Sequence, residues 1–304
     1  MSAPASRRVV VTGAASGIGL EASLQLACRG DHIVVADRNV AGGEAAVRRI
    51  NAAGGSAEFR ELDLADLSRI RDFAKAELAR DQPLDVLINN AGLLPPMERA
   101  TTRDGFELKF GVAHLGHFAL TGWLLPALAR SEQPRVVSVS SLAHARGRID
   151  FDDLQCERRY NSTIAYSRTK LACLVFAREL HRRATSAGSN LISVAAHPGI
   201  SKTPIAAGWE REERRNLWGR FELFGYRMSM RLFGQSAAAG AHPLVFAATE
   251  PSVVGGSYYG PTGFGQMGGP TGPVQPSRRA LDTVVAARLW EASERLTSVR
   301  YATL

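Results

Sequence analysis

Segments of strand length alternate with longer amphipathic segments along almost the whole chain. The strand-length segments are residues 9–11, 33–36, 57–62, 86–88, 135–139 and 191–196, with a further short one near residue 258. Apolar residues recur at helical spacing in residues 20–27, 42–52, 68–80, 106–128, 166–187, 236–248 and 278–296. This alternation predicts an α/β fold, a doubly wound parallel sheet with helices on both faces.

No shift of composition divides the chain into separate domains. Residues 255–276 are dense in glycine and proline, but only one predicted helix follows them, so they are read as a loop rather than a linker. We therefore predict a single domain over residues 1–304. Residues 204–235 mix charges with tryptophan, phenylalanine and methionine, which favours a lid over an apolar ligand. A peripheral helical pair is the alternative.

Composition and charge argue against several classes of function. The chain is 45% hydrophobic, with no apolar run long enough to span a bilayer and no secretory pattern in residues 1–8. Its three cysteines have neither metal-ligand nor disulfide-framework spacing. The formal net charge is +8, but arginines are interleaved with acids rather than gathered in a patch. We expect a cytoplasmic protein that binds no nucleic acid, spans no membrane and holds no metal.

The first predicted strand ends at a glycine-rich turn. Residues 12–19 read Thr-Gly-Ala-Ala-Ser-Gly-Ile-Gly and lie between that strand and a helix. In this context glycines let backbone N–H groups approach a phosphate at a helix N-terminus. The G-x-x-x-G-x-G spacing differs from the G-x-G-x-x-G dinucleotide fingerprint, so an ordinary strand-to-helix turn stays open as the alternative.

Small and polar residues also follow the next strands. Asp37 lies 20 positions after Gly17, where an acid can accept hydrogen bonds from an adenosine ribose. Arg38 follows it and could instead meet a 2′-phosphate. Asp63-Leu64 and residues 89–92, Asn-Asn-Ala-Gly, come at the ends of two further strands. The carboxyl ends of parallel strands form the edge at which open α/β sheets bind ligands.

A tyrosine and a lysine lie four residues apart at the start of a predicted helix. Tyr166 and Lys170 share one face of that helix, in a chain with only four lysines. An ammonium beside a phenol favours the phenolate, so such a pair can exchange a proton with an alcohol or ketone near neutral pH. Ser141 follows a strand end and precedes Tyr166 by 25 residues. A solvated tyrosine and lysine are the alternative interpretation.

Other polar residues are less specific. Beyond the strand that ends at residue 196, Thr203 is the hydroxyl best placed at the sheet edge, with Ser201 as the alternative. His114 and His117 are three positions apart. We interpret them as packing or hydrogen-bonding residues, because no third metal ligand is evident.

Together these motifs resemble the short-chain dehydrogenase/reductase family over nearly the whole chain. The matching residues are Thr12-Gly13, Gly17-Ile18-Gly19, Asp63-Leu64, Asn89-Asn90-Ala91-Gly92, Ser141, Tyr166, Lys170, Pro198-Gly199 and Thr203. Residues 114–118 (His-Leu-Gly-His-Phe), 151–155 (Phe-Asp-Asp-Leu-Gln) and 158–160 (Arg-Arg-Tyr) resemble its retinol-dehydrogenase-like branch. The resemblance implies a Rossmann-type domain and an NAD(P)-dependent interconversion of hydroxyl and carbonyl groups, often on lipophilic substrates.

The resemblance also implies a role for each matching residue. Tyr166 would be the general acid/base, Lys170 would assist it and hold the nicotinamide ribose, and Ser141 would hydrogen-bond the reacting oxygen. The implied coenzyme contacts are Gly13, Ser16, Gly17, Ile18, Gly19, Asp37, Arg38, Asp63, Leu64, Asn90, Ala91, Gly92, Tyr166, Lys170, Pro198, Gly199 and Thr203. Because Asp37 would repel a 2′-phosphate, we predict NAD as the coenzyme, with NADP as the alternative.

One position departs from the family pattern. Ala113 stands where the family usually has an asparagine, which completes a Ser-Tyr-Lys-Asn set and helps hold a proton-relay water. A backbone carbonyl can still bind that water, so we expect weakened chemistry. The alternative is a coenzyme-binding regulatory or interaction protein with little turnover. The family commonly pairs through the helices that match residues 106–128 and 166–187, which implies a homodimer or homotetramer.

Overall fold

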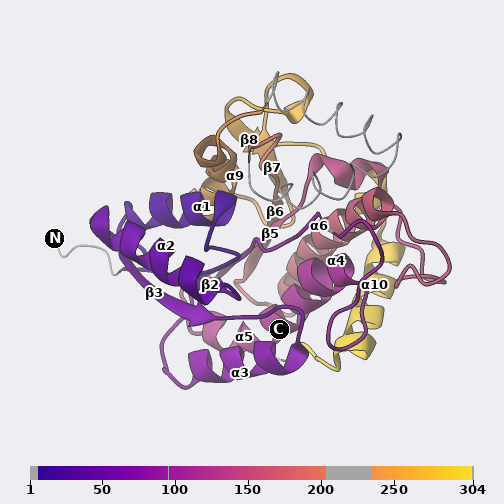
Figure 1. Ribbon diagram of the computed structural model, residues 1–304, viewed down its shortest axis with the longest axis horizontal. Coiled ribbons are helices and arrows are strands. Elements are labelled where there is room, and N and C mark those ends of the chain that lie inside the picture. The colour runs from indigo at the N-terminus through magenta and orange to yellow at the C-terminus, as the bar shows by residue number, and fades with distance from the viewer. Residues whose placement is uncertain (1–5, 95, 203–233, 303–304) are drawn as a thin grey trace.

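The computed structural model describes residues 6–94, 96–202 and 234–302 (Figure 1). Within these residues eight strands form one sheet in the order β3-β2-β1-β4-β5-β6-β7-β8, and every neighbouring pair is parallel except β7 with β8. The strands are β1 (Arg8–Thr12), β2 (His32–Asp37), β3 (Ser56–Glu61), β4 (Val86–Asn89), β5 (Arg135–Val139), β6 (Ile192–Ala196), β7 (Tyr258–Pro261) and β8 (Thr271–Pro273). The predicted α/β fold is confirmed.

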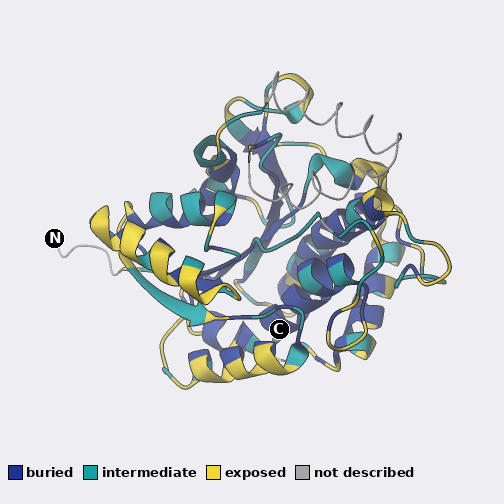
Figure 2. Ribbon diagram, viewed as in Figure 1, coloured by how far each residue is buried: buried dark blue, intermediate teal, exposed yellow. Residues whose placement is uncertain are grey.

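Helices cover both faces of this sheet, because successive strand residues point to opposite faces. Val9 and Val11 pack with α1, α2 and α9, whereas Val10 packs with α3, α5 and α6. These helices are α1 (Gly17–Ala27), α2 (Val40–Ala52), α3 (Leu67–Leu78), α5 (His117–Leu128), α6 (Ser162–Ser186) and α9 (Ala237–Thr249). Figure 2 shows that the central strands are buried and the edge strand β3 is only partly so, and that the outer surfaces of flanking helices such as α2 and α3 are exposed. Among the described residues, no helix is long and apolar enough to cross a membrane.

The segment predicted as one helix over residues 106–128 is composite. A short helix, α4 (Leu108–Phe110), passes into a π-helical turn, Gly111–Gly116, and then into α5. The hydrophobic pattern of the sequence does not reveal the π turn, because a helix that contains one wider turn still buries the same apolar residues. Pro126 lies inside α5, which continues to Leu128. The π turn matters for the site because it contains Ala113.

The C-terminal part of the chain differs most from the prediction. β7 and β8 form an antiparallel pair in a region predicted mainly as loop, and the last helix, α10 (Thr283–Thr297), begins five residues later than expected. A 3₁₀ turn, Arg278–Leu281, precedes it. α10 lies over α6 (Figure 1), where the Trp290 ring is 6.0 Å from the Phe176 ring and 5.1 Å from the Phe118 ring.

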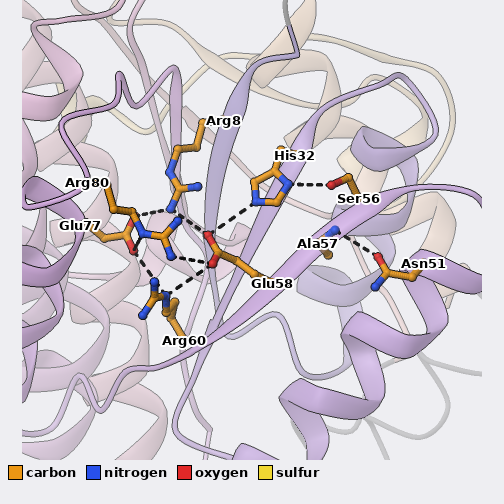
Figure 3. Close-up of polar contacts among 9 residues, drawn as sticks. All are labelled: Arg8, His32, Asn51, Ser56, Ala57, Glu58, Arg60, Glu77 and Arg80. Carbon is orange, nitrogen blue, oxygen red and sulfur yellow. Dashed lines mark hydrogen bonds and ion pairs between the residues drawn. The ribbon is translucent and has the colours of Figure 1, made fainter.

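An ion-pair network joins β1 and β3 to the end of α3 (Figure 3). The buried Arg8 guanidinium lies 2.6 Å from the Glu77 carboxylate and 3.0 Å from that of Glu58. Arg80 contacts Glu58 at 2.7 Å, and Arg60 lies within ion-pair distance of both acids. Removing one partner of a buried pair leaves an uncompensated charge, so this network ties the start of β1 to β3 and to the end of α3. The candidate site lies at the opposite, carboxyl ends of the strands.

Candidate active site

The glycine-rich turn after β1 adopts a backbone that requires glycine at particular positions. Gly13 and Gly17 have φ values of +66° and +58°, a region that residues with a side chain rarely adopt. A Cβ atom at Gly19 would collide with the Gly13 carbonyl oxygen and would lie 2.6 Å from Nδ2 of Asn90. The turn therefore passes close to the end of β4 and leads directly into α1.

The amino terminus of α1 has the properties of an anion site. Its N-cap residue, Ser16, makes no side-chain hydrogen bond to the first turn, whereas Asn39, Asp66 and Asn161 cap α2, α3 and α6 through their side chains. Unpaired N–H groups and the helix dipole favour a negative group here. A pyrophosphate fits this position, because glycines let it approach the backbone closely.

The ends of β1 and β4 are locked together by one side chain. The Thr12 hydroxyl oxygen accepts hydrogen bonds from the backbone N–H groups of Asn90 at 2.9 Å and Ala91 at 3.0 Å. The Asn90 amide donates to the Thr12 carbonyl at 2.8 Å. A Cβ atom at Gly92 would lie 3.3 Å from the Lys170 ammonium. The Asn-Asn-Ala-Gly segment thus lies between the glycine-rich turn and the predicted proton-transfer pair.

A cavity of about 330 Å³ brings most of the predicted coenzyme residues together. Its lining includes Gly13, Ser16, Gly17, Ile18, Gly19, Asp37, Arg38, Asp63, Leu64, Asn90, Ala91 and Gly92. The Asp37 carboxylate is held in place, accepting hydrogen bonds from the backbone N–H groups of Ala15 at 3.1 Å and Asn39 at 2.9 Å. Arg38 is exposed. The fixed Asp37 carboxylate and the exposed Arg38 are therefore neighbours in the lining of this cavity.

A second cavity, of about 370 Å³, contains the predicted catalytic residues. Ser141, Tyr166 and Lys170 line it together with Pro198, Gly199 and Ser201. It shares Ile18 and Asn90 with the first cavity, so the two adjoin. Its remaining wall combines the apolar side chains of Leu94, Met97, Leu142 and Ile200 with polar residues that include Arg146, Ser162 and Thr163. The cavity can therefore take an apolar ligand beside a small group of polar residues.

The Tyr166–Lys170 pair lies within α6, one turn further from its start than predicted. Asn161 caps this helix, which begins at Ser162, by accepting a hydrogen bond from the N–H of Ile164 at 3.0 Å. Lys170 is 4% exposed, donates to the Val139 carbonyl at 2.9 Å, and lies 5.9 Å from the centre of the Tyr166 ring. A buried ammonium is thereby held against the end of β5 and beside the tyrosine.

Ser141 is oriented by the backbone that follows it. It is the N-cap of a 3₁₀ turn, Leu142–Arg146, and its Oγ accepts a hydrogen bond from the Ala143 N–H at 3.2 Å. Because this bond uses a lone pair, the hydroxyl proton remains available to an oxygen in the second cavity. Its neighbour Ser140 donates to the Lys170 carbonyl at 2.7 Å, which fixes the end of β5 to α6.

The carbonyl of Ala113 is engaged within the protein. It accepts hydrogen bonds from Nδ1 of His117 at 3.0 Å and from Sγ of Cys173 at 3.1 Å. Since Nδ1 donates, Nε2 of His117 accepts from the Thr12 hydroxyl at 2.8 Å. Burial lowers the pKa of His117 to about 4, which keeps the ring neutral. A carbonyl has two lone pairs, so a water could bind at Ala113 only by sharing or displacing one of these donors.

Some predicted residues lie elsewhere or outside the described part of the chain. Thr203 and nearly all of the predicted lid, residues 204–235, fall outside the described residues. Ser201, the alternative hydroxyl, donates to the Pro198 carbonyl at 2.8 Å. His114 is buried and lies 2.9 Å from Oγ of Ser293 on α10, so it takes part in packing and hydrogen bonding, as interpreted.

Two residues near Ser141 escaped the sequence analysis. His144 lies 2.7 Å from the Ser141 carbonyl oxygen through Nδ1, and the Tyr258 hydroxyl lies 3.4 Å from the same oxygen. The spacing of three residues between Ser141 and His144 was the available signal for the histidine. Tyr258 comes from β7, 117 residues away in sequence, and no local pattern links it to the serine.

A doubly wound sheet with an open glycine-rich turn and a Ser-Tyr-Lys set at the same edge defines a dinucleotide-binding α/β protein. Residues 7–214 match the short chain dehydrogenase family. Retinol dehydrogenase 13 of Homo sapiens is 38% identical over 299 residues, covering 96% of this chain and 85% of that protein. Retinol dehydrogenase 12 of Mus musculus is 38% identical over 301 residues, covering 96% and 87%. The chain therefore belongs to the short-chain dehydrogenase/reductase family and is an enzyme of that family.

Solved structures agree with this assignment. A crystal structure of a Mycobacterium paratuberculosis protein is 43% identical, with a TM-score of 0.79, and covers 97% of this chain and 94% of that one. A variant of actinorhodin polyketide ketoreductase, solved with NADPH, has a TM-score of 0.66 at 22% identity and covers 85% of this chain and 96% of that one. The second likeness shows the fold alone.

Proposed function

We propose that this enzyme interconverts a hydroxyl and a carbonyl group on a lipophilic small molecule by hydride transfer, with NAD(H) as coenzyme. The observation that supports this most directly is the adjoining pair of cavities. One has the glycine turn and Asp37, and the other has Ser141, Tyr166 and Lys170 beside an apolar wall. Family membership supports the same reaction class.

The bound nicotinamide would supply the hydride in reduction and accept it in oxidation. In reduction the Tyr166 hydroxyl would give a proton to the carbonyl oxygen of the substrate while its carbon takes up the hydride. The Ser141 hydroxyl would donate a hydrogen bond to the same oxygen as negative charge develops on it. Lys170, held by the Val139 carbonyl, would stabilise the resulting phenolate and bind the nicotinamide ribose. Oxidation of the alcohol follows the same steps in reverse.

The proposed preference for NAD(H) rests on the Asp37 carboxylate. Its two oxygens each accept one backbone hydrogen bond and so keep further lone pairs, with which this cavity-lining carboxylate would accept from the two ribose hydroxyls. A 2′-phosphate in that place would meet a fixed negative charge. Arg38 favours NADP(H) instead, but its exposed side chain can turn to solvent.

The proposed lipophilic substrate is supported by the apolar wall of the second cavity and by the aromatic and methionine content of residues 204–235. If residues 204–235 form a lid, trimming Trp209 or Trp218 to alanine should raise KM more for long-chain or multi-ring substrates than for small ones. Equal effects on small polar alcohols would favour the peripheral helical pair.

The regulatory alternative is supported by one observation, the engaged carbonyl of Ala113. Without the usual asparagine, and with this carbonyl already bound, a proton relay through position 113 would be hindered. A protein with such a blocked proton relay would bind coenzyme but turn over little substrate.

We propose that any homodimer or homotetramer uses a face other than the predicted helices. Along α5 only Pro126 is exposed among its described residues, and α6 is buried over most of its length. α10 packs on α6 and reaches Phe118 of α5 through Trp290, and beyond α10 Tyr301 donates to the Phe118 carbonyl at 2.6 Å. Hydrogen exchange in α5 and α6 should be unchanged between dilute and concentrated protein. Protection that appears there on association would contradict the proposal.

A panel of alcohols and ketones tests the reaction class. The members would range from short polar alcohols to long-chain and ring-containing ones, each assayed with both coenzymes at the absorbance of the reduced nicotinamide. We expect turnover that rises with apolar size and is faster with NAD(H). Coenzyme binding without turnover of any member would favour the regulatory alternative.

A further inference from the structure

Behind the Ser141 side chain lies a buried histidine with a hydrogen bond at each ring nitrogen. His144 is 4% exposed and does not line the second cavity. Its Nδ1 lies 2.7 Å from the Ser141 carbonyl oxygen, and its Nε2 lies 3.1 Å from the backbone nitrogen of Ser277. The ring thus connects the serine to the loop that leads into the C-terminal 3₁₀ turn.

The two partners determine which nitrogen has the proton. A carbonyl oxygen only accepts, so Nδ1 must donate to Ser141, and a backbone N–H only donates, so Nε2 must accept from Ser277. The ring is therefore neutral, with its proton on Nδ1. Burial agrees with this state, because it lowers the pKa of His144 below its ordinary value.

A tyrosine lies beside both this carbonyl and the histidine, with its hydroxyl 3.5 Å from Nδ1 of His144. The Tyr258 hydroxyl lies 3.4 Å from the Ser141 carbonyl oxygen, and the two rings are nearly perpendicular, with centres 5.2 Å apart. Burial raises the pKa of Tyr258 far above its usual value, so its hydroxyl remains a donor. The backbone N–H of His144 also donates to this carbonyl, at 3.0 Å. The two His144 donors use both lone pairs of this oxygen and fix the orientation of the peptide after Ser141, with the Tyr258 hydroxyl as a longer contact.

We infer that His144 is a positioning residue for the reaction proposed above: it fixes the backbone of Ser141 so that the hydroxyl points at the reacting oxygen. The inference rests on the proposed function. A hydrogen-bond donor stabilises the developing charge only if it is already aimed at it, and small misplacements of catalytic groups are costly. His144 would affect turnover without touching the substrate.

Two amide substitutions separate the hydrogen bonds of the ring. The asparagine amide reaches the place of Nδ1, so His144→Asn retains a donor to Ser141 and loses the bond to Ser277. The glutamine amide reaches the place of Nε2, so His144→Gln retains the acceptor for Ser277 and loses the bond to Ser141. We expect His144→Gln to lower kcat by about 10–100-fold and His144→Asn to change it by no more than about threefold. Coenzyme Kd should stay within about twofold in both variants.

A double-mutant cycle with Ser141→Ala distinguishes positioning of the serine from a general effect of His144 on the structure, because only positioning couples the two substitutions in kcat. If His144 acts by aiming the serine hydroxyl, His144→Gln should lower kcat in the wild type but have almost no further effect on Ser141→Ala. Additive losses in the cycle, or equal losses for the two His144 variants, would overturn the inference. Melting temperatures identify variants that fail to fold. Ser277→Pro is a second way to remove the Nε2 contact alone, because the φ of −63° at this position suits proline.

The outcomes also distinguish this inference from the proposed function. Wild-type turnover that persists in His144→Gln contradicts the positioning role and leaves the reaction class intact. Absence of wild-type turnover with every alcohol and ketone contradicts both.

Discussion

Replacing Asp37 should change the coenzyme preference of the enzyme. Asp37→Asn keeps the size of the side chain but removes the charge and one acceptor oxygen. In the structure those two oxygens are already bound by the N–H groups of Ala15 and Asn39. The single oxygen of the variant cannot serve both backbone donors and also the ribose hydroxyls. NAD(H) should therefore lose charged hydrogen bonds.

The size of the change follows from two effects. A hydrogen bond to a charged group contributes about 1.5–3 kcal/mol, so NAD affinity should fall by about one to two orders of magnitude. A 2′-phosphate near this exposed end of the cavity repels the carboxylate by about 1 kcal/mol per unit charge in water-like surroundings. NADP affinity should therefore rise by about tenfold once Asp37 is neutral. The ratio of the two dissociation constants should move by two to three orders of magnitude.

The assay is a titration of each coenzyme into wild type, Asp37→Asn and a control variant. Calorimetry or tryptophan fluorescence detects the binding. Asp72→Asn is a matched control, because Asp72 is an exposed acid on α3 that lines neither cavity. It should leave both constants unchanged. Tighter NADP(H) binding by the wild type, or an unchanged ratio in Asp37→Asn, would refute the reasoning and assign the choice to Arg38.

Three further predictions test stability and the unusual Ala113. Ala113→Asn should change turnover by no more than about tenfold, which corresponds to a change of about 1.4 kcal/mol in the activation barrier. An unpaired buried amide at this position should also lower the stability seen in melting curves by about 1–3 kcal/mol. Turnover that appears only in this variant would favour the regulatory alternative. Glu77→Gln should lower the free energy of unfolding, measured in urea, by about 3 kcal/mol, because it removes a negative charge that balances Arg8 in the network of Figure 3. A loss under about 0.5 kcal/mol would show that the network adds little to stability. Burial lowers the pKa values of four histidines, among them those of His114 to about 3 and of His117 and His197 to about 4. In the unfolded chain these histidines bind a proton near pH 6.5, whereas in the folded chain they stay neutral. The free energy of unfolding should therefore fall as the pH drops from about 6.5 to 4. A stability that does not change in that pH range would contradict the buried neutral state.

The strands and the coenzyme turn could be predicted from the sequence because their signals are local. The six predicted parallel strands agree with the structure to within one residue at each end. Buried parallel strands are short apolar runs, and the glycines at positions 13 and 17 mark backbone that needs φ above zero. Once a parallel sheet is predicted, the motifs at its strand ends are expected to lie together at one edge, even though they are far apart in the sequence.

The remaining features depend on contacts between distant segments. The π turn at Gly111–Gly116 leaves the apolar pattern intact, and β8 is a three-residue strand within a glycine-rich loop. The bond between His144 and Ser277 joins residues 133 positions apart. The covering of α5 and α6 by α10 likewise depends on where the C-terminal helix docks. Nothing near these residues in the sequence specifies such partners.

Turnover by Tyr166→Phe tests the central claim most directly. The substitution removes only the phenolic oxygen proposed to exchange a proton with the substrate. The matched control is Tyr259→Phe, a buried tyrosine of β7 that lines neither cavity and accepts a hydrogen bond from the Val254 N–H at 2.8 Å.

Both variants and the wild type would be assayed with the best substrate of the panel, alongside coenzyme titrations and melting curves. We predict that Tyr166→Phe binds coenzyme almost as the wild type does and loses turnover by a factor on the order of 10²–10⁴, whereas Tyr259→Phe retains it. Retention of most of the wild-type turnover in a folded, coenzyme-binding Tyr166→Phe variant would contradict the account.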